Sequence, residues 1–326
     1  MREKFKNTSA KEKYSIFIVL FVMIFFCSLL NKNFLSPNNI SNIMKQLAVS
    51  TILAYGEMLL IISGMLDLSS GAVLALSGVI SIIVYKSTGS LVLAVIVALV
   101  IAVVCNIINA IMITHLNAPP FIATLVMQQA ARGVALLITN GQNILQIKNY
   151  TIFGQGYIGA IPISIIITAV ITVAIWYILR HTRLGRSLYA IGGNEEASIA
   201  AGITVKKNKY IVFMINGVLV GIAGILFMSR VNAGLPNGAI GYEMEGLTAA
   251  IVGGTSFSGG VGTTMGTLAG AFIIGCLNNI MNLIGVDSYV QQIVKACIIA
   301  LAVIWDIRSK SKKTRKVILV EDKPAA

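Results

Sequence analysis

The residues that could do chemistry in this sequence are polar side chains set inside long apolar runs. Asn106 and Asn109 lie three residues apart, and Asn278 and Asn282 lie four apart, so each pair shares one face of a helix. Their amides could line a pathway for a hydroxylated solute, or they could tie neighbouring helices together. Both interpretations stay open at the level of sequence.

Ionisable groups near membrane depth are few, and most of them lie far apart along the chain. They are Glu57, Asp67, Arg132, Glu243, Glu245 and Lys295. A proton or sodium relay needs several carboxylates in sequence along one path, so this set does not favour one.

Catalysis and metal binding find no support in the sequence. No glycine-rich loop ends in Lys followed by Ser or Thr, as nucleotide phosphates require. His115 and His181 are the only histidines and lie far apart, which excludes a histidine metal site or a catalytic triad. We therefore expect no catalytic residue, no metal and no cofactor bound by this chain.

The elements that must position the polar residues are apolar helices. The chain of 326 residues is 56% hydrophobic and 11% charged, whereas soluble proteins carry about a quarter charged residues. Each crossing of a bilayer needs ~20 apolar residues as a helix. The apolar runs are 14–35, 43–63, 70–85, 91–115, 119–139, 160–180, 210–229, 242–257, 263–284 and 289–307. The sequence predicts an all-α polytopic membrane protein with about ten transmembrane helices.

Two of these runs are interrupted. Residues 43–63 contain Gly56 and Glu57, and residues 242–257 end near Gly253. Irregular or polar backbone at membrane depth must be covered by protein, so we expect these two runs to be bent or half-spanning.

Basic residues give the orientation. Residues 1–13, 180–209 and 308–326 hold 18 of the 25 Lys and Arg residues. Such juxtamembrane segments stay in the cytoplasm, which predicts both termini inside, basic tails at 1–13 and 308–326, and one transmembrane domain at 14–307 with a cytoplasmic loop at 181–209. Anionic membrane lipid explains the basic C-terminal tail, so we expect no nucleic-acid partner.

Small residues recur every four positions at Gly262, Gly266 and Gly270, and again at Gly217 and Gly221. Ridges of this kind let helix backbones approach closely in lipid. They indicate helix packing within the chain or, alternatively, an interface between subunits.

The cytoplasmic loop contains one predicted helix. Asn194 can cap it, and Glu195 and Glu196 then lie in the first turn, where negative charge meets the helix dipole favourably. A helix that ends near Gly202 is too short to be stable alone. It is either a docking element for a partner protein or a solvated connector.

This segment carries a resemblance to a known family. Glu196-Ala197-Ser198, followed after three residues by Gly202, resembles the cytoplasmic coupling motif of the permeases of ATP-driven (ABC) importers. Gly64–Gly71, Pro119–Leu125 and Gly253–Gly260 are similar to segments of the ribose-type branch. The four matches come in the same order and span about residues 35 to 307.

The resemblance implies a sugar-importer permease in the cell membrane. Its implied partners are a second permease copy or paralogue, a cytoplasmic ATPase that carries ATP and Mg, and an extracytoplasmic solute-binding protein. The coupling residues it implies are Gly193, Asn194, Glu195, Glu196, Ala197 and Gly202. It implies a bend near the translocation pathway at Asp67, Ser69 and Gly71. The alternatives are an ion-driven secondary carrier or facilitator and a branched-chain amino-acid permease.

Overall fold

The computed structural model describes residues 2–321, with side chains described over residues 16–304 and at Arg308. The side chains of the two predicted basic tails, Arg308 excepted, therefore lie outside the described residues. The fold is all-α, as predicted. Its helices are α1 (Arg2–Leu30), α2 (Pro37–Ile62), α3 (Ser70–Thr88), α4 (Leu91–Thr114), α5 (Pro120–Thr139), α6 (Ile152–Gln155), α7 (Ile163–His181), α8 (Arg183–Gly193), α9 (Glu195–Ala200), α10 (Val205–Val231), α11 (Tyr242–Val252), α12 (Thr264–Leu283) and α13 (Ser288–Glu321).

The described strands are only two residues long and lie in the connections. β1 (Ile144–Leu145) pairs antiparallel with β4 (Ala233–Gly234), which joins the segment after α5 to the segment after α10. β2 (Tyr157–Ile158) and β3 (Ile161–Pro162) form a hairpin before α7, and a 3₁₀ turn, η1 (Lys148–Thr151), precedes α6.

Each predicted apolar run overlaps one helix. Seven described helices are long and apolar enough to cross a membrane, namely α2, α3, α4, α5, α7, α10 and α12. Shorter apolar stretches occur in α1, at Ile16–Leu30, and in α13, at Ser288–Ile304. The two interrupted runs differ from each other. α11 is a short helix of 11 residues, whereas α2 is one uninterrupted helix of 26 residues and is not half-spanning, because Gly56 and Glu57 are enclosed by neighbouring helices.

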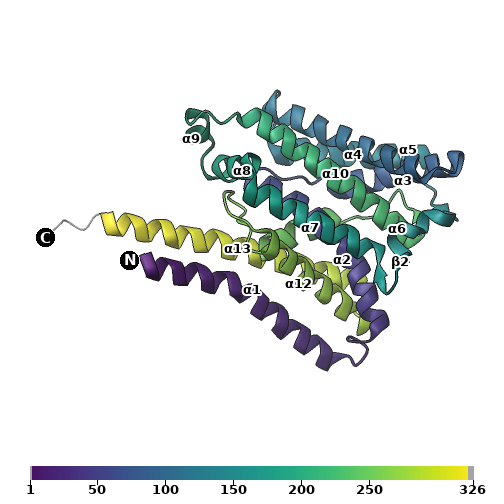
Figure 1. Cartoon of the computed structure of the whole chain (residues 1–326), viewed down its shortest axis with the longest axis horizontal. Helices are drawn as coiled ribbons and strands as arrows, with labels where there is room; N and C mark the ends of the chain where they lie inside the picture. The colour runs from purple at the N-terminus through teal and green to yellow at the C-terminus, as the bar shows by residue number, and fades with distance from the viewer. Residues whose placement is uncertain (1, 322–326) are drawn as a thin grey trace.

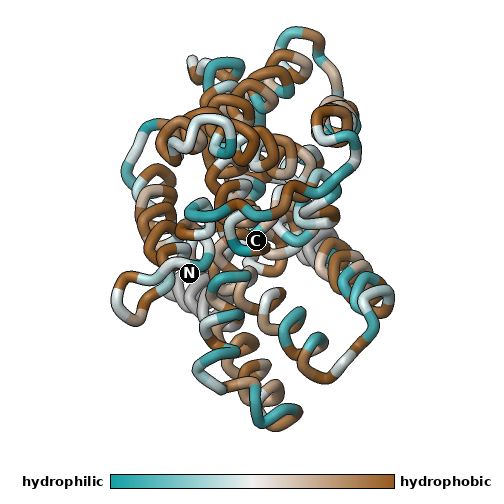
Figure 2. Tube along the Cα trace, turned by 90° about the vertical axis from the view of Figure 1, so that its right-hand side faces the viewer, coloured by the Kyte–Doolittle hydropathy of each residue, from teal (hydrophilic) through white to brown (hydrophobic). Residues whose placement is uncertain are grey.

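The long helices run in similar directions along the molecule (Figure 1). The start of α1 and the end of α13 lie toward the same end as α8 and α9, whereas α6 and β2 lie at the opposite end. A view onto that opposite end shows hydrophobic residues along the helices and hydrophilic residues mostly in the connections (Figure 2). This distribution suits helices that cross an apolar layer and connections that meet water.

Helix α2 is the most enclosed of the long helices, since most of its side chains from Leu47 to Ile62 are buried against α10, α11, α12 and α7. The outer helices expose large apolar side chains such as Leu137 on α5 and Val170 on α7. An apolar exterior around a buried centre is what contact with lipid requires. The same arrangement leaves the interior free to hold polar groups, provided that they bond one another.

Glycines allow the closest helix contacts. A Cβ at Gly217 or Gly221 would press on the α4 backbone, and a Cβ at Gly266 or Gly270 would clash with the end of α11. These four glycines thus pack on helices of the same chain. Gly262 lies in the loop before α12 rather than on its surface, because Thr263 caps that helix by accepting a hydrogen bond from the Gly266 amide at 3.1 Å.

Candidate functional site

The segment α8–α9 protrudes at the end of the molecule that also holds the start of α1 (Figure 1). The Asn194 side chain caps α9, since its Oδ1 accepts a hydrogen bond from the Ala197 amide at 2.8 Å. The helix stops after six residues because Gly202 adopts a left-handed conformation, with φ of 80°. The local structure therefore follows the capping pattern in the sequence.

Nearly all of this segment is exposed. From Gly193 to Gly202 only Ser198 is buried, and the apolar side chain of Ile199 is 58% exposed. Glu195 forms an ion pair with Lys209 at 2.8 Å, which ties α9 to the start of α10, whereas Glu196 faces solvent. An exposed helix that presents an apolar side chain, Ile199, and the exposed Glu196 carboxylate can meet a partner protein without rearrangement.

A second group of residues forms a polar network inside the helix bundle. Its centre is Asn216 on α10, whose Nδ2 donates to Oδ2 of Asp67 at 2.7 Å and to Oδ1 of Asn106 at 2.9 Å. Oδ1 of Asp67 accepts hydrogen bonds from the amide of Ser69 at 2.8 Å and from its hydroxyl at 2.5 Å. All four residues are at most 1% exposed.

The network also reaches α2 and a further position on α4. Nδ2 of Asn109 donates to the Ser69 hydroxyl at 3.0 Å, and Oε2 of Glu57 accepts from the Asp67 amide at 3.3 Å. Four segments that are distant in sequence are thereby linked: α2, the connection between α2 and α3, α4 and α10. In the part of the chain with described side chains, the ion pairs are Lys209–Glu195 and Lys295–Glu245, so neither Glu57 nor Asp67 belongs to one.

The absence of a side chain at Gly71 allows the start of α3, next to this network, to lie close to α11. A Cβ at Gly71 would clash with Oε2 of Glu243 and approach the Ala239 carbonyl oxygen to 2.7 Å. Oε1 of Glu243 accepts from Gln128 of α5 and from the Gly241 amide, both at 3.2 Å. The short helix α11 thus begins against the first turn of α3.

The second predicted asparagine pair lies in a separate cluster. Nδ2 of Asn278 donates to Glu245 at 3.1 Å, and the same carboxylate pairs with Lys295 at 2.6 Å. Asn282 accepts from Gln291 of α13 at 2.9 Å. These bonds join α12 to α11 and to α13. All four predicted asparagines therefore bond other parts of the chain in this structure.

Among the polar residues with structural partners, Asn216 and Asn39 were not singled out from the sequence. Asn216 was missed although it stands alone in the apolar run 210–229, which is the signal that could have found it. Asn39 and Asn279 exchange reciprocal amide bonds of 2.9 Å and join α2 to α12. Their separation of 240 residues leaves no local signal.

At the end opposite α9, two side chains connect the loops. Arg132 of α5 donates to the carbonyl oxygens of Pro236 and Gly238 at 2.7 and 2.8 Å, and Lys86 of α3 donates to that of Leu145 at 3.2 Å. These bonds act together with the pairing of β1 and β4.

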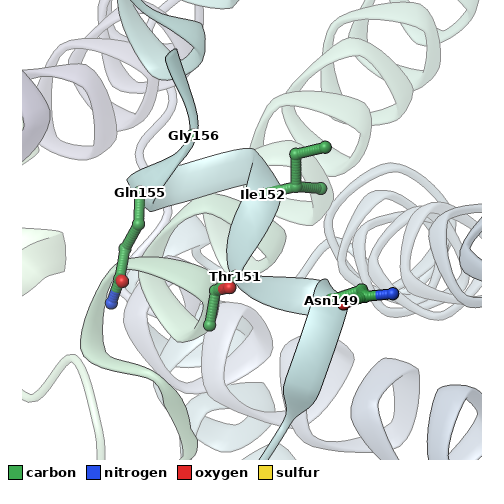
Figure 3. Close-up of a pocket in the computed structure, with 5 residues that line it drawn as sticks. All are labelled: Asn149, Thr151, Ile152, Gln155 and Gly156. Atoms are coloured by element: carbon green, nitrogen blue, oxygen red, sulfur yellow. The ribbon is translucent and has the colours of Figure 1, made fainter.

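A hollow of about 320 Å³ lies in the surface near α6, lined by Asn149, Thr151, Ile152, Gln155 and Gly156. The side chains of Asn149 and Gln155 extend in different directions and do not converge on one point (Figure 3). A site for a small solute needs convergent polar groups in a concave pocket, which this hollow does not offer. Within the described residues no group of three His, Cys, Asp or Glu side chains could hold a metal ion.

Comparisons with known proteins identify a family and several relatives of this chain. The family described as "Branched-chain amino acid transport system / permease component" matches residues 39–303. The ribose import permease protein RbsC of Escherichia coli (strain K12) is 40% identical over 310 residues, which are 94% of this chain and 96% of that protein. RbsC of Bacillus subtilis (strain 168) is 41% identical over 92% of this chain and 94% of its own. The D-allose transport system permease protein AlsC of Escherichia coli (strain K12) is 33% identical over 90% of this chain and 91% of its own. No solved structure matches the chain.

Proposed function

Because the chain belongs to the family of permease components named above, we propose that it is the membrane-spanning subunit of an ATP-driven importer for a sugar or a similar polyhydroxylated solute. It is a transport permease and not an enzyme, and it is a multi-pass protein of the inner membrane. The observation that carries the proposal is the identity of 33–41% with ribose and allose permeases over at least 90% of the chain.

The chain passes the membrane ten times, with both termini and α8–α9 in the cytoplasm. α11 is roughly 16 Å long, about half the hydrocarbon core, so its passage is completed by the loop before α12. Two contacts support this path. The Gly260 amide bonds the end of α2 near α8, and Asn31 bonds the Leu283 carbonyl oxygen at the opposite end.

A separate ATPase engages α9, and an extracytoplasmic binding protein delivers the solute to a pathway formed by two permease subunits. The exposed Glu196 and Ile199 support this role for α9. Closure of two ATPase domains moves the paired α9 helices and exchanges inward-open for outward-open arrangements of the permease dimer. The buried network of Asp67 and Asn216 holds the helices of each subunit together during this exchange.

The test is purification of the chain from its native membrane with its bound proteins, followed by reconstitution into vesicles. We expect an ATPase to copurify, and uptake of ribose, allose or arabinose to require ATP and the binding protein. Uptake by the chain alone along an ion or solute gradient would instead indicate a secondary carrier or facilitator. Uptake of leucine in place of any sugar would indicate a branched-chain amino-acid permease.

A further inference from the structure

Three segments that are distant in sequence meet directly behind α9. They are the end of α8, the end of α2 and the loop between α11 and α12. The Gly260 amide in that loop donates to the Ile62 carbonyl oxygen at 2.9 Å, and the Tyr189 hydroxyl of α8 donates to the Gly262 carbonyl oxygen at 2.7 Å. Burial raises the pKa of the Tyr189 phenol above its usual value.

Glycines make this meeting a contact of backbones. A Cβ at Gly192 would clash with the Ile62 carbonyl oxygen and approach the Gly260 amide nitrogen to 2.6 Å. Gly259 and Gly260 have positive φ values of 83° and 71°, which disfavour other residues. A Cβ at Gly259 would in addition lie 2.7 Å from the Gly192 carbonyl oxygen. No flexible side chain lies between these backbones, so a displacement of α8 is transmitted rather than absorbed.

Ile62 connects this backbone contact with the buried polar network around Asp67 and Asn216. It is the last residue of α2, and Asp67 follows five positions later in the connection to α3. The connection is held at both ends, since the Met65 amide bonds the Leu60 carbonyl oxygen at 2.9 Å and Asp67 bonds Asn216 of α10. A shift of Ile62 would therefore also move the start of α3 and the part of α10 around Asn216.

The other partner in the contact leads to α11 and α12. The loop starts at Gly253, where a Cβ would lie 2.6 Å from the Gly266 carbonyl oxygen of α12. The loop ends at Thr263, whose hydroxyl caps the start of α12. The loop is thus fixed to two helices as well as to α8.

We propose that the backbone contact of Gly192 with Ile62 and Gly260 is the relay through which movement of α9 reaches the helices of the permease. Gly192, Gly260 and Tyr189 are positioning residues in this relay. The inference rests on the proposed function and deepens it, because it names the path from the ATPase-facing helix to α2, α3, α11 and α12.

The experiment uses the purified complex of the permease with its ATPase in vesicles, with the binding protein and the transported sugar supplied. Solute uptake and ATP hydrolysis are measured together for wild type, Gly192→Ala and Tyr189→Phe. Gly133→Ala is the control, because that glycine is also helical and has open space around the position of a Cβ. ATPase copurification and the thermal midpoint report assembly and folding for each variant.

We expect Gly192→Ala to keep the ATPase bound and ATP hydrolysis running, while solute moved per ATP falls about 5- to 150-fold, the range of typical coupling between two sites. Tyr189→Phe should lower this ratio by a smaller factor, with only a small drop of the thermal midpoint because the Gly262 carbonyl oxygen loses one donor. Gly133→Ala should leave the ratio unchanged. If Gly192→Ala fails to assemble with the ATPase, the ratio of solute moved per ATP in Tyr189→Phe tests the proposal.

An unchanged ratio in the assembled variants overturns the relay. A parallel fall of uptake, hydrolysis and thermal midpoint also overturns it, since that pattern indicates a structural contact alone. Failure of the proposed function would look different, because the wild-type complex itself would then not import sugar with ATP.

Discussion

The contact between Gly56 and Asn216 allows a quantitative test of the buried polar network. Asn216→Ala removes the donor that serves Asp67 and Asn106 and leaves two buried oxygens without it. Each unsatisfied buried group costs about 1–3 kcal/mol, so the variant should lose roughly 2–6 kcal/mol of stability. Gly56→Ala should also destabilise, because the new Cβ would clash with Oδ1 of Asn216, and overpacking costs about 1–3 kcal/mol.

The double variant separates this contact from general effects. Once Asn216 is shortened, the nearest remaining neighbour of a Cβ at Gly56 is Leu219, at 3.8 Å, so the second substitution should cost little. The double variant should therefore be more stable than the sum of the two single losses predicts, by about 1–3 kcal/mol. Gly133→Ala is the control for the gain in helix propensity from glycine to alanine, which is about 1 kcal/mol.

The assay is denaturant or thermal unfolding of the purified permease in detergent, compared across wild type, the two single variants, the double variant and the control. If the losses of the single variants simply add, to within about 0.5 kcal/mol, the two positions do not touch and the placement of Asn216 against α2 is incorrect.

Three further outcomes are expected. Glu196→Lys should leave membrane insertion intact and abolish sugar uptake and stimulated ATP hydrolysis in reconstituted vesicles; wild-type rates would show that α9 does not engage the ATPase. Lys209→Ala should change the thermal midpoint little, because its ion pair with the exposed Glu195 is worth under about 1 kcal/mol, and a large drop would indicate a deeper role. Asn39→Ala should destabilise by roughly 1–3 kcal/mol, because it leaves the buried amide of Asn279 unpaired, and Asn279→Ala should cost a similar amount in the same unfolding assay.

Features set by local sequence could be predicted. The apolar runs became helices because a backbone surrounded by hydrocarbon must bond itself, and the cap at Asn194 formed because its side chain and the Ala197 amide are three residues apart. The short α11 followed from the paired glycines after it. These features depend on a few neighbouring residues, which the sequence lists directly.

Features set by distant partners could not be predicted. Asp67 and Asn216 are 149 residues apart, and no periodicity indicates that one carries the donor for the other. Gly262 fits a four-residue repeat, yet it lies before the helix, because Thr263 is the N-cap and α12 begins at Thr264. The same reasoning applies to α2, which stays continuous through Gly56 and Glu57 because other helices supply the contacts there.

The short pairing of β1 with β4 has a mechanical consequence at the end of the molecule opposite α9. Together with Arg132, whose guanidinium holds two carbonyl oxygens of the segment before α11, it fastens the loop after α5 to the loop after α10. A protein that binds either loop therefore also displaces the other loop. The force of binding is thus distributed over the N- and C-terminal halves of the permease. An epitope inserted into one loop would, for the same reason, disturb the shape of the other.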